Sequence, residues 1–140
     1  MIMNALKNIY LILFLALSIT LVSCDDEDDP ITKSRTEMLT AGVWTGDKVI
    51  EDGEDVTDIW RESSNPWDMQ KYSIEFLEDG TYIQRYEGQP DQSGTWEFIR
   101  DEEFIEFNGV EKVEVGTLEN DELQLIYDRE GVEQEHFFVR

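Results

Sequence analysis

The strongest constraint on this chain is the alternation of apolar and polar residues between residues 43 and 140, which a turn signal interrupts every few residues. In the segment 71–77, Tyr72, Ile74 and Phe76 fall on one face, as expected for a half-buried β-strand. The dipeptide Asn108-Gly109 is the strongest hairpin signal in the sequence. Short turns of this kind favour antiparallel pairing between consecutive strands. The pattern therefore predicts an all-β fold.

About eight strands follow from this pattern. We expect them at residues 43–50, 71–77, 81–86, 95–100, 104–107, 110–118, 123–127 and 132–140, with a polar loop at 87–94. Because an open meander would leave unpaired edges, we expect the strands to close into an up-and-down barrel. Closure pairs the last strand with the first and brings Arg140 close to Trp44. Ser34 and Glu37 match a capping box, which predicts a short helix at 35–41.

Large side chains at inward strand positions are expected to form the core, namely Phe76, Trp96, Phe98, Phe107 and Leu125. The long connection 56–70 carries Trp60 and Trp67, and successive connections of a meander alternate between the two ends of a barrel. Both tryptophans are therefore expected over one end, the mouth, with Tyr86 beneath them. They either plug the mouth or line a ligand entrance, where aromatic side chains with a polar handle suit an apolar or a glycan ligand.

The first 23 residues have the pattern of a targeting segment. Lys7 precedes an apolar run of about 14 residues, which is within the range of a signal peptide and shorter than the ~20 residues that span a bilayer. Leu21-Val22-Ser23-Cys24 resembles the lipobox of bacterial lipoproteins, and Cys24 is the only cysteine in the chain. The resemblance implies cleavage before Cys24 and a covalent lipid, including palmitate, on this residue. The alternative is an ordinary secretory signal with a chance cysteine, or an uncleaved anchor.

An acidic run follows the cysteine directly: Asp25, Asp26, Glu27, Asp28 and Asp29. It resembles the export signal of Bacteroidetes-type surface lipoproteins, which implies a protein anchored in the outer membrane and displayed on the cell surface. The alternative is a solvated acidic tether. We therefore divide the chain into a signal peptide at 1–23, a lipidated cysteine and tether at 24–34, and one barrel domain at 35–140.

The charge balance excludes one class of partner. The chain has 33 Asp+Glu against 11 Lys+Arg, a formal net charge of −22. Nucleic acids and anionic lipid headgroups are bound through basic patches, so we expect neither as a partner. Removal of the first 23 residues leaves 140 − 23 = 117, which is enough for one domain whose core needs no disulfide.

A second resemblance concerns the barrel. Gly42-Val43-Trp44 follows the expected helix and opens the first strand, as the Gly-x-Trp motif does in lipocalins. The stretches 76–82, 94–96 and 118–125 resemble recurring stretches of the lipocalin-like domains on Bacteroidetes lipoproteins. The cysteine pair that many of these domains carry is absent. The resemblance implies a lipocalin-like barrel with a possible cavity, but no particular substrate, because the family has no single activity.

Catalytic and metal-binding patterns are weak. His136 is the only histidine, which is too few for a typical zinc site, and Ser63-Ser64 lacks a nucleophile-elbow pattern. Acidic pairs are too frequent to mark a glycosidase site, and the acidic turn 51–55 lacks EF-hand spacing. We expect no enzymatic activity and no cofactor besides the lipid on Cys24.

These observations favour a surface-exposed lipoprotein whose barrel binds a small apolar or glycan ligand or assists an envelope complex. The alternative is a protein-interaction module with a filled barrel and no small-molecule ligand. A continuous cavity would favour the first function, and a packed interior would favour the second. A buried acid or histidine beside a cleft would favour the third and least favoured alternative, a hydrolase.

Overall fold

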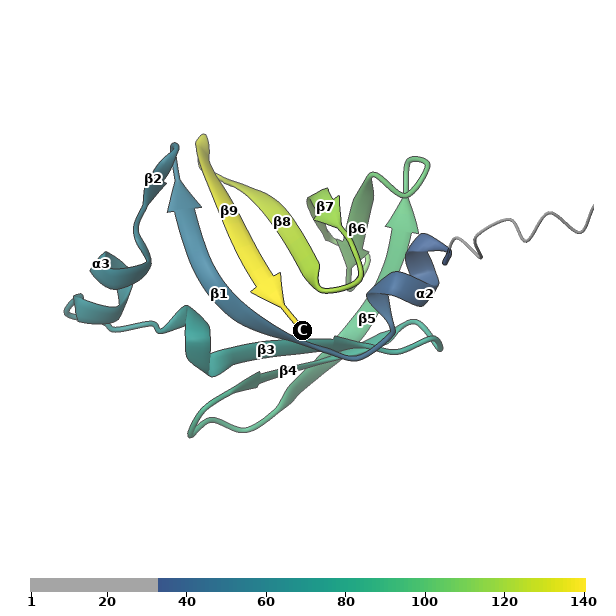
Figure 1. Cartoon of the computed structure of the whole chain (residues 1–140), viewed down its shortest axis with the longest axis horizontal. Coiled ribbons are helices and arrows are strands. Elements are labelled where there is room, and N and C mark those ends of the chain that lie inside the picture. Colours follow the sequence, from purple (N-terminus) through teal and green to yellow (C-terminus); the bar gives the residue numbers. More distant parts are fainter. Residues whose placement is uncertain (1–32) are drawn as a thin grey trace, which may run out of the picture. The chain divides into compact units, whose positions relative to one another are not determined.

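Eight antiparallel strands close into an up-and-down barrel, with a ninth, two-residue strand extending one edge (Figure 1). The computed structural model describes residues 33–140. The strands are β1 (Val43–Glu51), β2 (Glu54–Asp55), β3 (Tyr72–Phe76), β4 (Thr81–Tyr86), β5 (Gln92–Ile99), β6 (Phe104–Phe107), β7 (Glu111–Leu118), β8 (Glu122–Arg129) and β9 (Val132–Val139). The helices are α2 (Arg35–Leu39), α3 (Thr57–Glu62) and the 3-10 helix η1 (Met69–Lys71). The predicted all-β barrel with a short N-terminal helix is confirmed.

The barrel closes through β1, which pairs with β3 along one edge and with β9 along the other. Thr45 lies opposite Val139, and this register brings the C-terminal residue back to the start of the first strand. The guanidinium of Arg140 lies 4.0 Å from the centroid of the Trp44 ring. The predicted proximity of these two residues is therefore confirmed.

Helix α2 begins at a capping box, as predicted. The Glu37 backbone amide donates to the Ser34 hydroxyl at 3.1 Å, and the Ser34 amide donates to the Glu37 carboxylate at 2.7 Å. These bonds satisfy amides that a helix start leaves without partners. The indole N–H of Trp44 donates to the carbonyl of Leu39 at 2.8 Å, so the helix closes this end of the barrel.

An irregularity between Gly46 and Lys48 changes which residues of β1 point inward. Trp44 and Gly46 are buried before it, and Val49 is buried after it. A Cβ atom on Gly46 would lie 2.1 Å from the backbone oxygen of Met69. Only glycine therefore allows η1 to pack directly on the strand.

Most predicted boundaries differ from the structure by one or two residues, such as the end of α2 at Leu39 instead of residue 41, and the largest error is at the start of β5. Residues 87–94 were expected to form a loop, but Gln92 to Gly94 belong to β5, where Gln84 pairs with Gln92 and Tyr82 with Gly94. The sequence suggests a loop because Gly94 interrupts the alternation. In the structure a Cβ atom on Gly94 would lie 2.2 Å from the Asn108 side-chain oxygen, so the glycine permits a close approach inside a strand.

The hydrophobic core fills the barrel from its closed end, where α2 and the β3–β4 turn lie. Its largest fully buried side chains are Trp44, Phe76, Phe138, Leu39, Met69 and Ile74. Of the five predicted core residues, Phe76, Trp96, Phe107 and Leu125 are buried, and Phe98 packs partly buried against them. No helix in the part of the chain described is long and apolar enough to cross a membrane.

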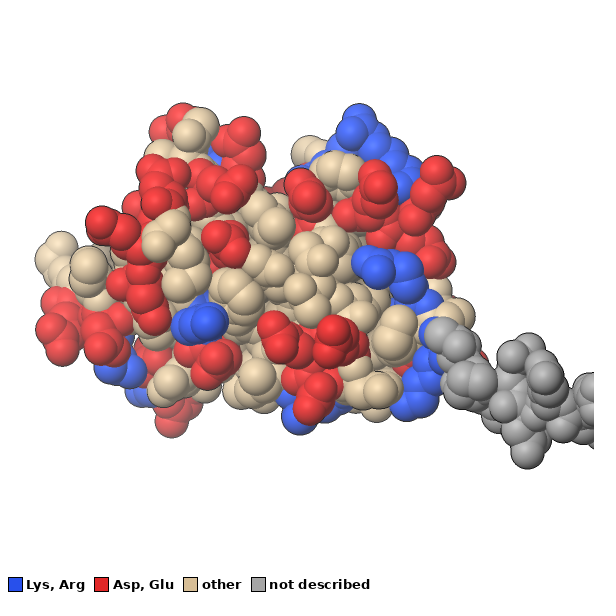
Figure 2. Space-filling model, turned by 45° about the horizontal axis from the view of Figure 1, so that its top comes forward, with Lys and Arg blue, Asp and Glu red and all other residues tan. Residues whose placement is uncertain are grey.

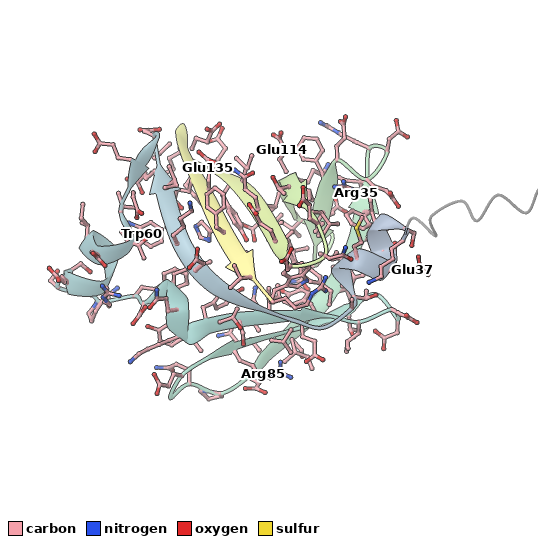
Figure 3. All side chains as sticks on the ribbon, viewed as in Figure 1. Arg35, Glu37, Trp60, Arg85, Glu114 and Glu135 are labelled. Atoms are coloured by element: carbon pink, nitrogen blue, oxygen red, sulfur yellow. The ribbon has the colours of Figure 1, made fainter. Side chains whose placement is uncertain are left out.

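Acidic side chains are spread widely over the visible outer surface (Figure 2). The two ends of the barrel carry different elements. Trp60 on α3 and Arg35 on α2 mark the mouth and the closed end, respectively (Figure 3). The segment predicted to be a signal peptide, Cys24 and the acidic run of Asp25, Asp26, Glu27, Asp28 and Asp29 lie outside the described residues.

Candidate functional site

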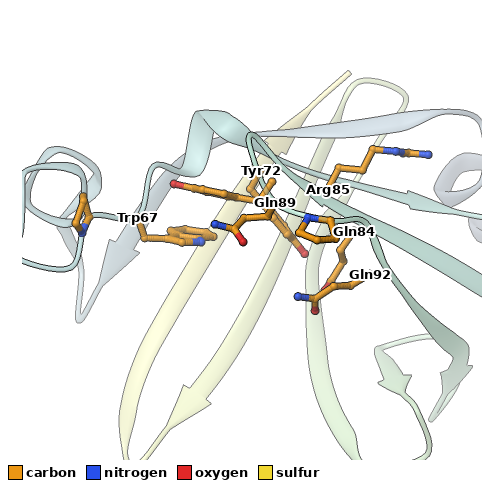
Figure 4. Close-up of a pocket in the computed structure, with 9 residues that line it drawn as sticks. Trp67, Tyr72, Gln84, Arg85, Gln89 and Gln92 are labelled. Carbon is orange, nitrogen blue, oxygen red and sulfur yellow. The ribbon is translucent and has the colours of Figure 1, made fainter.

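A cleft of about 440 Å³ opens at the mouth, between the connection 56–71 and the β4–β5 loop (Figure 4). Its floor consists of inward-facing residues of β3, β4 and β5. The lining residues are Pro66, Trp67, Tyr72, Gln84, Arg85, Tyr86, Gln89, Pro90 and Gln92. Aromatic faces and amide groups therefore dominate its surface.

Backbone hydrogen bonds fix Trp67 over the barrel. The Trp67 amide donates to the carbonyl of Trp60 at 3.2 Å, and the next amide, that of Asp68, donates to the Tyr86 hydroxyl at 3.0 Å. The Trp67 and Tyr86 rings are nearly parallel, at 14°, with their centroids 6.2 Å apart. Met69, which is buried against Gly46, holds the end of the connection against β1.

Behind the cleft, Trp67 belongs to an aromatic cluster that plugs the mouth. Its ring centroid lies 5.5 Å from that of Trp60, 5.7 Å from that of Tyr72 and 6.0 Å from that of His136. His136 in turn lies 4.6 Å from Tyr127. Rings at these separations stabilise one another beyond the area they bury. Trp60 and Trp67 therefore both act as a plug, whereas only Trp67 also lines the cleft.

Burial keeps the titratable groups of this cluster neutral. Desolvation, together with a smaller contribution from the Arg129 charge, lowers the pKa of His136 to about 4. Desolvation also raises the pKa of Tyr72 and of Tyr127 well above the usual tyrosine value. The His136 Nε2 atom is buried and has no hydrogen-bond partner among the described residues. All three groups are therefore uncharged at neutral pH, and of the three only Tyr72 lines the cleft.

The polar part of the cleft is also uncharged. Gln84, Gln89 and Gln92 gather to one side of Trp67, while the Arg85 side chain extends away from the indole (Figure 4). The guanidinium of Arg85 pairs with Glu75 at 2.9 Å and with Asp91 at 3.4 Å. Its charge is therefore balanced outside the cleft.

The structure brings together two of the three residues predicted to bind a ligand. Trp67 and Tyr86 line the cleft, and Trp60 lies behind Trp67. Sequence analysis missed the three glutamines. Gln84 could have been identified, because it shares the inward face of β4 with Tyr86, whereas Gln92 was assigned to a loop.

The residues considered for metal binding or catalysis do not come together in one site. The acidic turn 51–55 forms the β1–β2 hairpin, and no group of three potential metal ligands occurs within residues 33–140. The Ser63 hydroxyl bonds to the carbonyls of Trp60 and Asn65 in a turn. His136 points into the barrel from β9, beside the tryptophans rather than beside a serine.

The fold and the cleft together define an eight-stranded up-and-down β-barrel with an aromatic site at its mouth. Comparison with protein-family models gives no match to this chain, and comparison with curated proteins also gives none.

Proposed function

We propose that this protein is a lipid-anchored binding protein that holds a small molecule in the cleft at the mouth of its barrel. The observation that carries the proposal is Trp67, whose indole lines a cleft of about 440 Å³ between two connections. Small-molecule sites are typically concave, ~300–1,000 Å³ in volume, and lined by aromatic side chains with a few polar groups. The cleft has this size, and its lining combines three aromatic side chains with polar groups that make up the larger part of its surface.

We infer binding without catalysis. General acid–base catalysis needs a group whose pKa lies near the working pH. The pKa of His136 is about 4, and Tyr72 and Tyr127 titrate far above neutrality, so all three stay in one protonation state near pH 7. His136 also lies behind Trp67 rather than in the cleft lining.

The anchor is the second part of the proposal. The stretch Leu21-Val22-Ser23-Cys24 supports a lipid on Cys24, and two or three acyl chains would hold the protein stably in the outer membrane. The acidic run of Asp25, Asp26, Glu27, Asp28 and Asp29 supports display on the cell surface. A Cys24→Ala variant should lose palmitate labelling and leave the membrane fraction, and equal labelling of variant and wild type would refute the anchor.

Binding at the cleft can be tested with the full-length protein in detergent. Panels of glycans and small apolar compounds are titrated while tryptophan fluorescence is followed. Trp67→Ala should abolish any response, whereas Ile59→Ala, which changes an exposed residue of α3 in the same connection, should leave it intact. A response that survives in Trp67→Ala would place the site elsewhere.

The packed core favours a second function, a protein-interaction module within an envelope complex. Side chains from α2 and the strands fill the closed end of the barrel, and the aromatic cluster around Trp67 plugs the mouth, so the space left there is the cleft in front of this plug. If no compound binds and an envelope protein co-purifies through the acidic outer surface, this second function replaces the first.

A further inference from the structure

We propose that the ligand of the cleft is a neutral saccharide, held by ring stacking on Trp67 and by hydrogen bonds to three glutamine amides. This inference rests on the proposed function, since it names the class of molecule that the same cleft binds. It follows from the chemistry of the lining: aromatic faces, amides that both donate and accept, and a balanced charge.

The aromatic surface provides the stacking partner. One face of a pyranose ring presents C–H groups with a small positive charge, and the face of an aromatic ring is negative. Trp67 is half-buried, and hydrogen bonds from its own amide and from that of Asp68 hold it in place. A side chain already fixed in this way loses little conformational entropy when a ligand stacks on it.

The glutamines provide the hydrogen bonds. Gln84 and Gln92 are direct cross-strand partners on β4 and β5, and both line the cleft together with Gln89. Each amide has a carbonyl acceptor and two N–H donors, and each sugar hydroxyl both donates and accepts. Neighbouring hydroxyls can therefore pair with an amide at both of its ends. An apolar ligand would leave these groups without partners, which costs binding free energy.

The charges argue against ionic ligands. No carboxylate lines the cleft, so a cation would have only cation–π contacts there, beside the positively charged Arg85. Arg85 is the only charged lining residue, and its guanidinium is already paired with Glu75 and Asp91. The formal net charge of −22 repels anions from the whole protein. A neutral, hydroxyl-rich molecule matches this environment best.

The experiment uses the full-length protein, labelled with 5-fluorotryptophan and kept in a polyoxyethylene detergent. The chain has four tryptophans, so ¹⁹F NMR reports four sites. Trp44 and Trp96 are buried and do not line the cleft, and they serve as internal controls. The probes are cellobiose, maltose, mannobiose and N-acetylchitobiose as neutral sugars, galacturonic acid as an anion, choline as a cation, and phenol as an apolar ring.

At least one neutral sugar should shift the Trp67 resonance in a saturable way and leave the Trp44 and Trp96 resonances unchanged. The double variant Gln84→Leu, Gln92→Leu keeps side-chain volume and removes the amides. This variant should raise the Kd for the sugar about tenfold or more, because the sugar hydroxyls lose their hydrogen bonds to the two amides. Gln124→Leu makes the same change on the outward face of β8 and should bind like the wild type.

Three results overturn the saccharide assignment. If choline, phenol or galacturonic acid shifts the Trp67 resonance and no neutral sugar does, the cleft binds a ligand of another class, and the proposed function stands. If sugars bind equally well to the double glutamine variant, the amides do not recognise them. If no probe shifts Trp67, the proposed function fails together with this inference.

Discussion

Arg140, the last residue of the chain, covers the ring of Trp44 at the beginning of the first strand, at 4.0 Å from its centroid. Two further contacts hold the guanidinium in this position. It donates to the carbonyl of Met38 at 2.9 Å and, through Nε, to the carbonyl of Asn120 at 2.7 Å. One side chain thus links the helix, the first strand and the β7–β8 turn.

Arg140→Ala should therefore destabilise the barrel. Loss of the cation–π contact and of two carbonyl partners is expected to lower the free energy of unfolding by about 1–2 kcal/mol. Urea denaturation measures this change, with Lys33→Ala as a control that removes an exposed cation bonded to Asn120. Equal stability of Arg140→Ala and wild type would show that closure does not depend on this residue.

Gly46→Ala should disturb the site from a distance. The new methyl group would meet the Met69 carbonyl oxygen at 2.1 Å, so η1 and the adjoining Trp67 must move. Overpacking of this kind costs ~1–3 kcal/mol, and the near-ultraviolet circular dichroism of the tryptophans should change with it. Gly42→Ala is the matched control, because its Cβ would meet Arg140 at an ordinary 3.4 Å. Indistinguishable spectra for Gly46→Ala and wild type would contradict the direct packing of η1 on β1.

The turn Glu130-Gly131 offers a stabilising change. Both residues have positive φ, 59° and 87°, as in the Asn108-Gly109 turn, where the values are 53° and 67°. Asparagine tolerates this conformation better than glutamate, so Glu130→Asn should raise the free energy of unfolding by about 0.5–1 kcal/mol. The reverse exchange, Asn108→Glu, should be destabilising, because Asn108 also bonds to Thr95 and Tyr82. Thermal melts compare each variant with the wild type. Glu130→Asn should raise the melting temperature and Asn108→Glu should lower it.

His136 predicts a pH dependence of stability. Its pKa is about 4 in the folded protein and 6.5 as the ordinary value, so the unfolded chain binds more protons between these values. Stability from this group is complete above pH 6.5 and is lost as pH falls toward 4, by about 2 kcal/mol between pH 8 and pH 5. Carboxyl groups also change stability at low pH. The contribution of the histidine is therefore the difference in unfolding free energy between wild type and His136→Phe, followed as a function of pH. A pH-independent difference in urea unfolding would show that the imidazole is not buried in the neutral form.

Much of the fold was predictable because alternation and turn chemistry act locally. The bounds of β4 and β6 agree with the sequence pattern to the residue, and the capping box of Ser34 fixed the beginning of α2. The bulge after Gly46 was not predictable, because a single shift in the alternation cannot be distinguished from a polar residue at an inward position. The place of Gly94 inside β5 was not predictable either. Its glycine is required by the close approach of Asn108, which is distant in sequence.

The candidate site was predictable only in part. The alternation of connections between the two ends of a meander predicted Trp60 and Trp67 at the same end as Tyr86, and in the structure Trp67 stacks on Tyr86 with Trp60 packed against Trp67. The glutamines could not be recognised, because their convergence depends on strand register: Gln84 pairs with Gln92 only once the start of β5 is known. A polar residue on an inward face indicates a candidate binding site when its cross-strand neighbour is also polar.

The position of Lys33 has a consequence for how far the protein can reach. Lys33 bonds to Asn120 in the β7–β8 turn, so the N-terminal segment joins the barrel at the closed end. Nine peptide steps separate Cys24 from Lys33, at most ~30 Å of extended chain, and the barrel adds roughly 20 Å along its tilted strands. A lipid on Cys24 would therefore let the cleft reach at most about 50 Å from the lipid surface. Chains longer than a disaccharide could then be bound by one end while the rest extends into the medium.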